Sequence, residues 1–334
     1  MTSATTPADR VGPPPPFDPE LAQTLAAVVE TLPPSITPDL IAAFRAGPPG
    51  LAALSDDELR RGGEFEVFER TVPGPAGGPD VIVLVCRPAA ATAPTPAIYH
   101  THGGGMILGD RRTGLPDIVD LATSVGAAVI SVEYRLAPEH PYPAPVEDCY
   151  AGLVWVAENA EELNIDPARV VIAGASSGGG LAAAVALLAR DRGGPALAAQ
   201  MLQAPMLDDR NDTASARQMA GIGVWDRTSN ETGWAALLGA ARGGPDVSPY
   251  AAPARAAELA GLPPAFIYSG SAETFRDEDV AYASAIWRAG GQAELHVWSG
   301  GFHGFDLMAP QATVSQAAKA ARASWIRRIT APST

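Results

Sequence analysis

The chain has 334 residues, of which 47% are apolar and 18% charged, so it can bury a sizeable core and general disorder is excluded. Its 37 acidic residues against 23 basic ones give a formal charge of −14, which disfavours nucleic acid and anionic lipid as partners. The two cysteines, Cys86 and Cys149, are too few for a disulfide framework or a thiolate metal site.

The apolar runs are short. The longest candidate, residues 181–189, is well below the ~20 residues that a helix needs to cross a bilayer. The first residues, 1–7, show neither the positive charge nor the apolar segment of a secretory signal. We therefore expect no membrane insertion and a cytoplasmic location.

The N-terminal part predicts a tail followed by short helices. Residues 1–16 end in a run of four prolines, which disfavours helix and strand and predicts an extended tail without catalytic residues. Between Asp18 and Leu59 apolar residues recur at helical spacing, with breaks at proline and glycine pairs. We expect two or three short helices in residues 17–62, ahead of the main domain.

After Gly63 short apolar segments typical of strands begin. The first two, joined by the turn Pro73 to Pro79, predict an antiparallel hairpin at a sheet edge. From the third onward strands alternate with helical stretches, which predicts a mostly parallel sheet with helices on both faces, an α/β fold. The expected strands are residues 64–71, 80–87, 96–101, 127–134, 169–173, 200–203, 265–269 and 294–298, and the expected helices are 115–125, 146–163, 179–190, 278–289 and 311–330.

Residues 205–250 interrupt this alternation with polar turns and two tryptophans, Trp225 and Trp234. We interpret this stretch as an insertion that lies over the sheet together with the N-terminal helices. The α/β core then consists of residues 63–204 and 251–334.

A serine stands at the centre of a sharp turn after one of the buried strands. Residues 174–178 read Gly-Ala-Ser-Ser-Gly, follow an apolar strand and open a helix, which is the context that a G-x-S-x-G nucleophile turn requires. The glycines permit the tight turn, and the helix N-terminus behind Ser176 favours developing negative charge. The alternative is a Gly/Ser-rich helix start without chemistry. We predict that Ser176 is a nucleophile.

A serine hydroxyl is a poor nucleophile at neutral pH and needs a base. Of the five histidines, His303 lies in a glycine-flanked loop after the last strand, at the sheet end where the serine turn should emerge. A solvent-exposed loop histidine is the alternative. His296 lies within that strand, His140 in a proline-bound turn and His100 in an earlier strand, and all three are more typical of structural positions. We predict that His303 is the general base.

The base needs an orienting acid, which in this kind of site comes between the serine and the histidine in chain order. Glu273 is the first carboxylate after the preceding strand, residues 265–269. Asp277 is the competitor, although it could instead belong to the start of the following helix, where the helix dipole favours acidic residues. We predict Glu273 as the acid.

A tetrahedral intermediate also needs hydrogen-bond donors for its oxyanion. Gly103, Gly104 and Gly105 follow a strand and His102, and they provide main-chain amides without side chains in the way, as in the H-G-G-G loops of lipases and esterases. The partner donor is the amide of Ser177, and His102 is expected to orient the loop. A phosphate-binding loop is the alternative, but neither G-x-x-x-x-G-K-S/T nor the dinucleotide spacing is present.

Taken together, these motifs resemble the hormone-sensitive-lipase-like family of α/β-hydrolases, the bacterial family IV esterases. The resemblance runs from about Phe65 to the C-terminus. It rests on residues 102–105, 134–140, the Ser176 turn, and residues 248–250, 276–278 and 303–305.

The resemblance implies an eight-stranded α/β-hydrolase core with a helical cap made from residues 17–62 and 205–250. It also implies hydrolysis of carboxylic esters with short to medium acyl chains, no cofactor and no metal, Gly104 and Gly105 as the loop donors, and a homodimer through the last strand or helix. Two departures from the family pattern stand out: Ala175 and Ser177 beside the serine, and Glu273 where an aspartate is common.

Our hypothesis is therefore a carboxylesterase that acts on a small-molecule ester through Ser176, His303 and Glu273. Two alternatives remain open: hydrolysis of another carbonyl substrate (a lactone, amide or thioester), and a non-catalytic binder on the same scaffold. Acyl and alcohol preference depend on the cap. Candidates for its pocket lining are Phe17, Met206, Leu207, Trp225 and Trp234, although such residues are equally typical of a small core.

Overall fold

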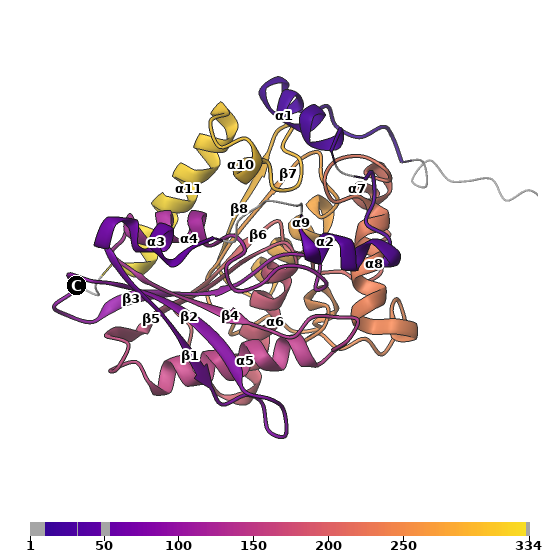
Figure 1. The fold of residues 1–334 in the computed structure, drawn as a ribbon. Helices are drawn as coiled ribbons and strands as arrows, with labels where there is room; N and C mark the ends of the chain where they lie inside the picture. The colour runs from indigo at the N-terminus through magenta and orange to yellow at the C-terminus, as the bar shows by residue number, and fades with distance from the viewer. Residues whose placement is uncertain (1–10, 32, 48–53, 332–334) are drawn as a thin grey trace, which may run out of the picture.

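The computed structural model describes residues 11–31, 33–47 and 54–331. Its centre is one eight-stranded sheet in the order β1-β2-β4-β3-β5-β6-β7-β8 (Figure 1). β2 runs antiparallel to both β1 and β4, and every other neighbouring pair is parallel. This confirms the predicted α/β class and the edge hairpin. The strands are β1 Phe65–Val72, β2 Val81–Pro88, β3 Thr95–Thr101, β4 Ala128–Glu133, β5 Ile165–Ala175, β6 Ala199–Gln203, β7 Ala265–Gly270 and β8 Ala293–Trp298.

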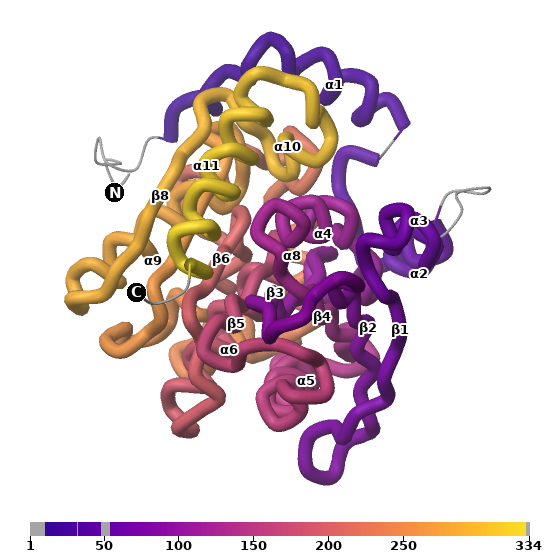
Figure 2. The backbone as a smooth tube through the Cα atoms, turned by 90° about the vertical axis from the view of Figure 1, so that its left-hand side faces the viewer, coloured from indigo at the N-terminus to yellow at the C-terminus, as the bar shows by residue number. Residues whose placement is uncertain are grey.

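The helices form a layer on each face of the sheet (Figure 2). One core joins α1, α3, α4 and α11 to one face, with side chains such as Leu59, Ile118 and Trp325. The other core joins α5, α6 and α9 to the opposite face, with Leu153, Val185 and others. The helices are α1 Pro19–Val29, α2 Ile41–Ala46, α3 Asp56–Arg60, α4 Leu115–Thr123, α5 Ala144–Glu158, α6 Ser177–Arg192, α7 Ala214–Gln218, α8 Arg227–Leu238, α9 Arg276–Arg288, α10 Phe305–Met308 and α11 Thr313–Thr330.

Burial explains why the central strands read as continuous apolar runs. Every residue of β3, β6 and β7 is buried, because helices cover both faces of the sheet there. The edge strands β1 and β8 are only partly buried. The candidate site therefore draws on strands of both kinds: Glu273 follows the fully buried β7, and His303 follows the partly buried edge strand β8.

Two predicted boundaries differ from the structure by four residues or more. The helix expected over residues 146–163 ends at Glu158, because Asn159 leaves helical geometry (φ −113°, ψ 23°) and its side-chain amide donates to the Trp155 carbonyl. β5 begins at Ile165 and not at Arg169, since Ile165 already pairs with Thr95 across a register shift. The short helix α10 was not expected.

Parts of the two segments assigned to a cap lie against loops that follow the carboxyl ends of the strands. Asp18 caps α1 and donates its main-chain N–H to the Gly300 carbonyl, which holds α1 against the loop after β8. Ser35 donates to Asp226 at the start of α8, so the N-terminal segment contacts the insertion. The exact division into cap and core stays a prediction, and residues 1–10 of the predicted tail lie outside the described residues. None of the helices in the described ranges is long and apolar enough to cross a membrane.

Candidate active site

Ser176 lies at the turn between β5 and α6 with a strained backbone, φ 58° and ψ −125°. The two glycines of the motif are sterically required. A Cβ on Gly174 would lie 2.3 Å from the Gly178 carbonyl oxygen, and one on Gly178 would lie 2.1 Å from the Thr101 carbonyl oxygen. The turn therefore presses against the end of β3, and Ser176 is only 9% exposed.

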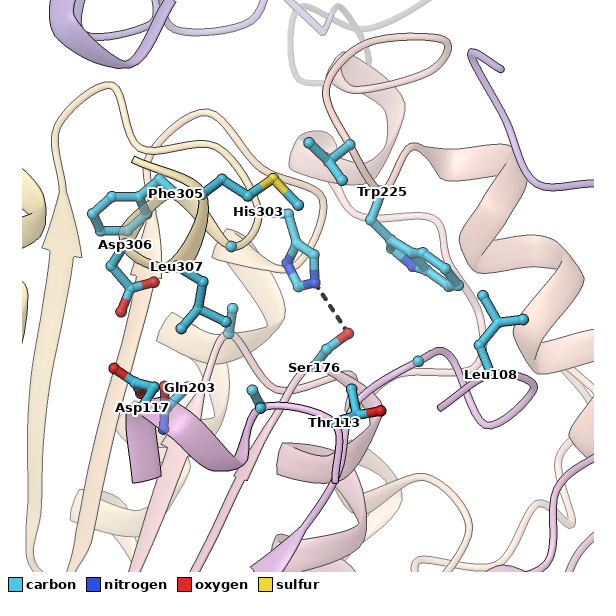
Figure 3. Close-up of a pocket in the computed structure, with 18 of the residues that line it drawn as sticks. Leu108, Thr113, Asp117, Ser176, Gln203, Trp225, His303, Phe305, Asp306 and Leu307 are labelled. Atoms are coloured by element: carbon cyan, nitrogen blue, oxygen red, sulfur yellow. Dashed lines mark hydrogen bonds between the residues drawn. The ribbon is translucent and has the colours of Figure 1, made fainter. Parts of the chain in front are cut away.

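His303 comes from the loop after β8, and its imidazole points at the serine (Figure 3). Its Nε2 lies 3.0 Å from Ser176 Oγ, a hydrogen-bond distance across 127 residues of sequence. The ring of Phe275 packs edge-on against the imidazole, with ring centroids 5.1 Å apart. The structure thus brings together the predicted nucleophile and base.

Glu273 follows β7 by three residues and lies behind the imidazole. Its Oε2 is 3.5 Å from His303 Nδ1, within ion-pair distance but longer than a normal hydrogen bond, and the residue is 2% exposed. Neither His303 Nδ1 nor Glu273 Oε1 has a hydrogen-bond partner among the described residues. The competitor Asp277 is turned away, because it accepts from the Ser215 main-chain N–H and from Arg276.

Two more buried carboxyl groups, Glu278 and Asp279, lie at the start of α9 near Glu273. Glu278 accepts hydrogen bonds from the main-chain N–H groups of Leu207 and Asp208. Burial, followed by the charges of Glu273 and Glu278, raises the pKa of Asp279 well above its ordinary value. Burial likewise raises the pKa of Glu278. The surroundings of Glu273 therefore hold acidic groups that favour the neutral form.

The glycine loop after β3 lines the cavity in front of Ser176. Gly104 and Gly105 have left-handed φ values of 123° and 64°, and a Cβ on Gly105 would lie 2.2 Å from the Trp225 ring. The main-chain N–H groups of Gly103, Gly104 and Gly105 donate to no described residue. Ser177 opens α6, where main-chain N–H groups lack a helical partner. These amides are available as donors.

The predicted role of His102 in orienting this loop agrees with its contacts. Its ring stacks on Tyr134 at 4.1 Å, and its Nδ1 lies 2.9 Å from the Gly103 carbonyl. The Tyr134 hydroxyl donates to the His102 carbonyl. Burial lowers the pKa of His102, so the ring favours its neutral form. His102 therefore holds the glycine loop through its stacking on Tyr134 and its contact with the Gly103 carbonyl.

The other histidines lie away from the serine. His140 is exposed, and His296 stacks on Trp298 within β8. His100 is buried in β3, where its Nδ1 contacts Ser131, and burial lowers its pKa to about 3. It also lines the cavity, which the sequence analysis did not anticipate.

A family model described as the alpha/beta hydrolase fold matches residues 98–307. Carboxylesterase NlhH of Mycobacterium tuberculosis is 39% identical over 75% of this chain and 79% of its own length. Esterase LipI of the same organism is 35% identical over 72% of this chain and 75% of its own length.

The solved structure of a bacterial heroin esterase is 38% identical with a TM-score of 0.85, covering 95% of this chain and 98% of its own. Esterase LipW from Mycobacterium marinum is 33% identical with a TM-score of 0.82, covering 96% and 99%. The chain belongs to the hormone-sensitive-lipase-like carboxylesterases. This family of α/β-hydrolases catalyses carboxylic-ester hydrolysis, and the protein is an enzyme of that class.

In this carboxylesterase one cavity of about 320 Å³ opens in front of Ser176. Of the five residues suggested for the cap pocket, Trp225 lines the cavity. Trp234, Met206 and Leu207 are buried in the core beside it, and Phe17 packs edge-on against Phe302. The apolar lining also includes Ile36, Phe44, Leu108, Val224, Leu307 and Met308.

Sequence reasoning missed the polar part of this lining. Asp117, Gln203, Tyr268 and Asp306 all face the cavity of the carboxylesterase. A signal for them exists: Gln203 is a polar residue that ends a fully buried strand. Buried polar groups need partners, so such a residue indicates either a network or a ligand site.

Proposed function

We propose that this carboxylesterase hydrolyses esters of short to medium acyl chains through a triad of Ser176, His303 and Glu273. The observation that carries the proposal is the 3.0 Å contact between His303 Nε2 and Ser176 Oγ. A nucleophile within hydrogen-bond reach of a base, with a buried carboxylate behind that base, is the arrangement that acyl transfer requires.

The first half of the reaction forms an acyl-enzyme. Ser176 Oγ attacks the ester carbonyl carbon while its proton passes to His303 Nε2. The carbonyl oxygen becomes an oxyanion, which the amides of Gly103, Gly104, Gly105 and Ser177 stabilise, with Gly104 and Gly105 as the main loop donors. The C–O bond to the alcohol then breaks, and His303 returns the proton to the departing alcohol oxygen.

The second half repeats these steps with water. Water attacks the acyl carbon and gives a proton to His303 Nε2. As the bond to Ser176 Oγ breaks, His303 passes this proton to Ser176 Oγ, and the carboxylic acid leaves. Glu273 accepts from His303 Nδ1, holds the imidazole in the correct tautomer and stabilises the imidazolium. The 3.5 Å separation of these atoms is consistent with a bond that tightens when substrate binds.

The cavity supports the chain-length part of the proposal. Its volume of about 320 Å³ is at the lower end of the usual range for small-molecule sites. Its walls near Trp225 and Leu108 are apolar, so they can bury a few methylene groups at about 0.8 kcal/mol each. Long acyl chains would extend beyond this space.

The test uses p-nitrophenyl esters from acetate to dodecanoate with wild type, Ser176→Ala and Ser284→Ala. Ser284 lies on α9 and its hydroxyl donates to the Val280 carbonyl, so it controls for the loss of a serine. We expect Ser176→Ala to lower kcat by a factor on the order of 10⁴ or more. Near-native turnover in that variant would reject the nucleophile, and a maximum kcat/KM at dodecanoate would reject the chain-length preference.

A further inference from the structure

The substrate cavity has two chemically different sides. In Figure 3, Asp306, Gln203 and Asp117 lie on one side of the proposed catalytic pair, where Phe305 and Leu307 also lie, and Trp225 and Leu108 lie on the other side. A purely apolar pocket would suffice for a simple alkanoyl ester. We call Asp117, Gln203, Tyr268 and Asp306 the polar wall.

The buried Arg322 holds one end of the polar wall. Its guanidinium binds both carboxylate oxygens of Asp117, each at 2.7 Å, and Nη1 also donates to Gln203 Oε1 at 2.7 Å. Arg322 is 2% exposed and Gln203 is 4% exposed. Because a guanidinium only donates, the Gln203 carbonyl oxygen must face it, and the amide Nε2 must face the other way.

The Tyr268 hydroxyl connects Gln203 to Asp306. Its oxygen lies 3.0 Å from Gln203 Oε1 and 2.5 Å from Asp306 Oδ2. Tyr268 has one proton, and Gln203 Oε1 has none, so both contacts are hydrogen bonds only if Asp306 supplies the second proton. Asp306 is 3% exposed, and burial raises its pKa. Among the described residues no cation lies within ion-pair distance of its carboxyl group.

This proton count leaves two polar atoms of the wall without a protein partner. Neither Gln203 Nε2 nor Asp306 Oδ1 bonds to another described residue, and neither is among the atoms sealed from the cavity. Gln203 Nε2 is a donor and Asp306 Oδ1 of a neutral acid is an acceptor. Both side chains bind the Tyr268 hydroxyl through their other oxygen atoms, so the two open atoms belong to one hydrogen-bonded network along the same wall.

We propose that the polar wall is a subsite for a hydroxyl group carried by the ester substrate. The hydroxyl accepts from Gln203 Nε2 or donates to Asp306 Oδ1, because each open position is complementary to one neutral hydroxyl. A buried charge would fit less well, because the Arg322 charge is already matched by Asp117. This inference rests on the proposed function and names the substrate class of the same site: hydroxyl-bearing esters.

The test compares matched esters in two series, because the hydroxyl could belong to the acyl or the alcohol part. The acyl series pairs methyl esters of ω-hydroxy acids, from 5-hydroxypentanoate to 8-hydroxyoctanoate, with methyl alkanoates of equal heavy-atom number. The alcohol series pairs 4-hydroxybutyl acetate with pentyl acetate. Methyl 6-aminohexanoate serves as a cationic probe. Acid release in a pH-stat yields kcat/KM for each.

We expect at least one hydroxyl ester to exceed its apolar partner by about tenfold in kcat/KM, the effect of one to two net hydrogen bonds. At least one of Gln203→Met and Asp306→Leu should abolish this ratio, and the variant that does so identifies the atom that binds the hydroxyl. Asp306→Asn keeps a neutral carbonyl oxygen toward the cavity and can donate to Tyr268, so it should retain the ratio. Gln200→Met is the matched control: Gln200 is buried on the same strand, bonds to the Pro263 carbonyl and lies outside the cavity lining.

Three results would overturn the subsite: no hydroxyl preference in either series, an equal loss in Gln200→Met, or a stronger preference for the cationic probe, which would indicate an ionised Asp306. Thermal unfolding of each variant separates loss of the fold from loss of the ratio. The proposed function fails differently, because then methyl heptanoate itself would show no turnover that depends on Ser176.

Discussion

Among single side chains, Glu273 is the most informative departure from the family pattern. A glutamate is one methylene longer than the aspartate common at this position, and its Oε2 still lies 3.5 Å from His303 Nδ1. Asp277 could not replace it without moving, since its oxygens already hold the Ser215 main-chain N–H and Arg276. The longer side chain therefore reaches from the end of β7 to the imidazole.

This assignment predicts that Glu273→Gln lowers kcat by a factor of roughly 10³ to 10⁴, because a neutral amide neither fixes the imidazole tautomer nor stabilises the imidazolium. Glu273→Asp should retain part of the activity, since it keeps the charge but withdraws it by one methylene. Kinetics on p-nitrophenyl butyrate measure both. Asp277→Asn is the matched control, and a larger loss there than in Glu273→Gln would transfer the acid role to Asp277.

Helices, strands and the loops between them position the reacting groups. The serine turn is pressed between β3 and α6, and the glycine loop is pressed against the insertion through Gly105 and Trp225. The cap thus contacts the proposed oxyanion donors directly. Any change in how the insertion packs should be transmitted to these amides.

Gly105→Ala tests this contact. The new Cβ would lie 2.2 Å from the Trp225 ring at a φ of 64°, so either the ring or the loop must move. We expect kcat to fall by about 10² to 10³, the usual effect of losing an oxyanion donor. Gly126→Ala is the control, because Gly126 has a φ of 63° with open space around it.

A second substitution separates two causes of the lower kcat: the clash of the new Cβ with the Trp225 ring, and the strain of an alanine at a φ of 64°. If the clash with the ring displaces the donor, Gly105→Ala in a Trp225→Ala background should cost much less than it does alone. If Gly105→Ala leaves kcat within a few-fold of wild type, then the new Cβ does not displace an oxyanion donor, and the proposed coupling between Trp225 and the glycine loop is wrong. Kinetics on p-nitrophenyl acetate, the smallest substrate of the series, limit direct effects of the missing ring.

Over the entire chain, the buried polar groups affect stability as well as chemistry. Asp279 is fully buried, and neither of its carboxyl oxygens has a hydrogen-bond partner among the described residues. Its raised pKa means that the folded protein holds this proton more tightly than the unfolded chain does. The free energy of unfolding should therefore fall as the pH rises from about 4, the ordinary pKa of an aspartate, to the raised folded value.

Asp279→Asn removes this titration. We expect the variant to gain stability over wild type as the pH rises, with a slope of up to about 1.4 kcal/mol per pH unit inside that window and little difference below it. Urea unfolding at pH 5 and at pH 8 measures the change. Asp80→Asn, at an exposed position, should show no such trend. A stability difference for Asp279→Asn that is independent of pH would contradict the buried neutral acid.

The edge of the sheet formed by β8 is the surface through which the predicted homodimer would form. β8 pairs only with β7 among the described strands, and it exposes Val297, which is 41% accessible. Trp287 on the neighbouring helix α9 is 47% accessible. The homodimer implied by the family resemblance stays a prediction.

Much of the fold followed from local pattern. The central strands are continuous apolar runs because both faces of the sheet are covered, and that pattern is visible along the chain. The end of α5 was missed because one residue, Asn159, ends the helix through its backbone angles and the hydrogen bond from its side chain to the Trp155 carbonyl. The end of a helix that depends on one residue leaves no trace in the spacing of apolar residues, which is the pattern used to predict helices.

The order of residues along the chain was enough to predict the class of fold and the chemistry expected at Ser176, His303 and the glycine loop, because tight turns and bare amides demand specific residue types at fixed spacing. The polar wall emerged only on folding. Gln203, Tyr268, Asp306 and Arg322 carry no motif, and they come together from β6, β7, α10 and α11. Their roles depend on which atoms face each other after the sheet and helices pack, and hydrogen bonding between segments far apart in the chain leaves no pattern in the sequence.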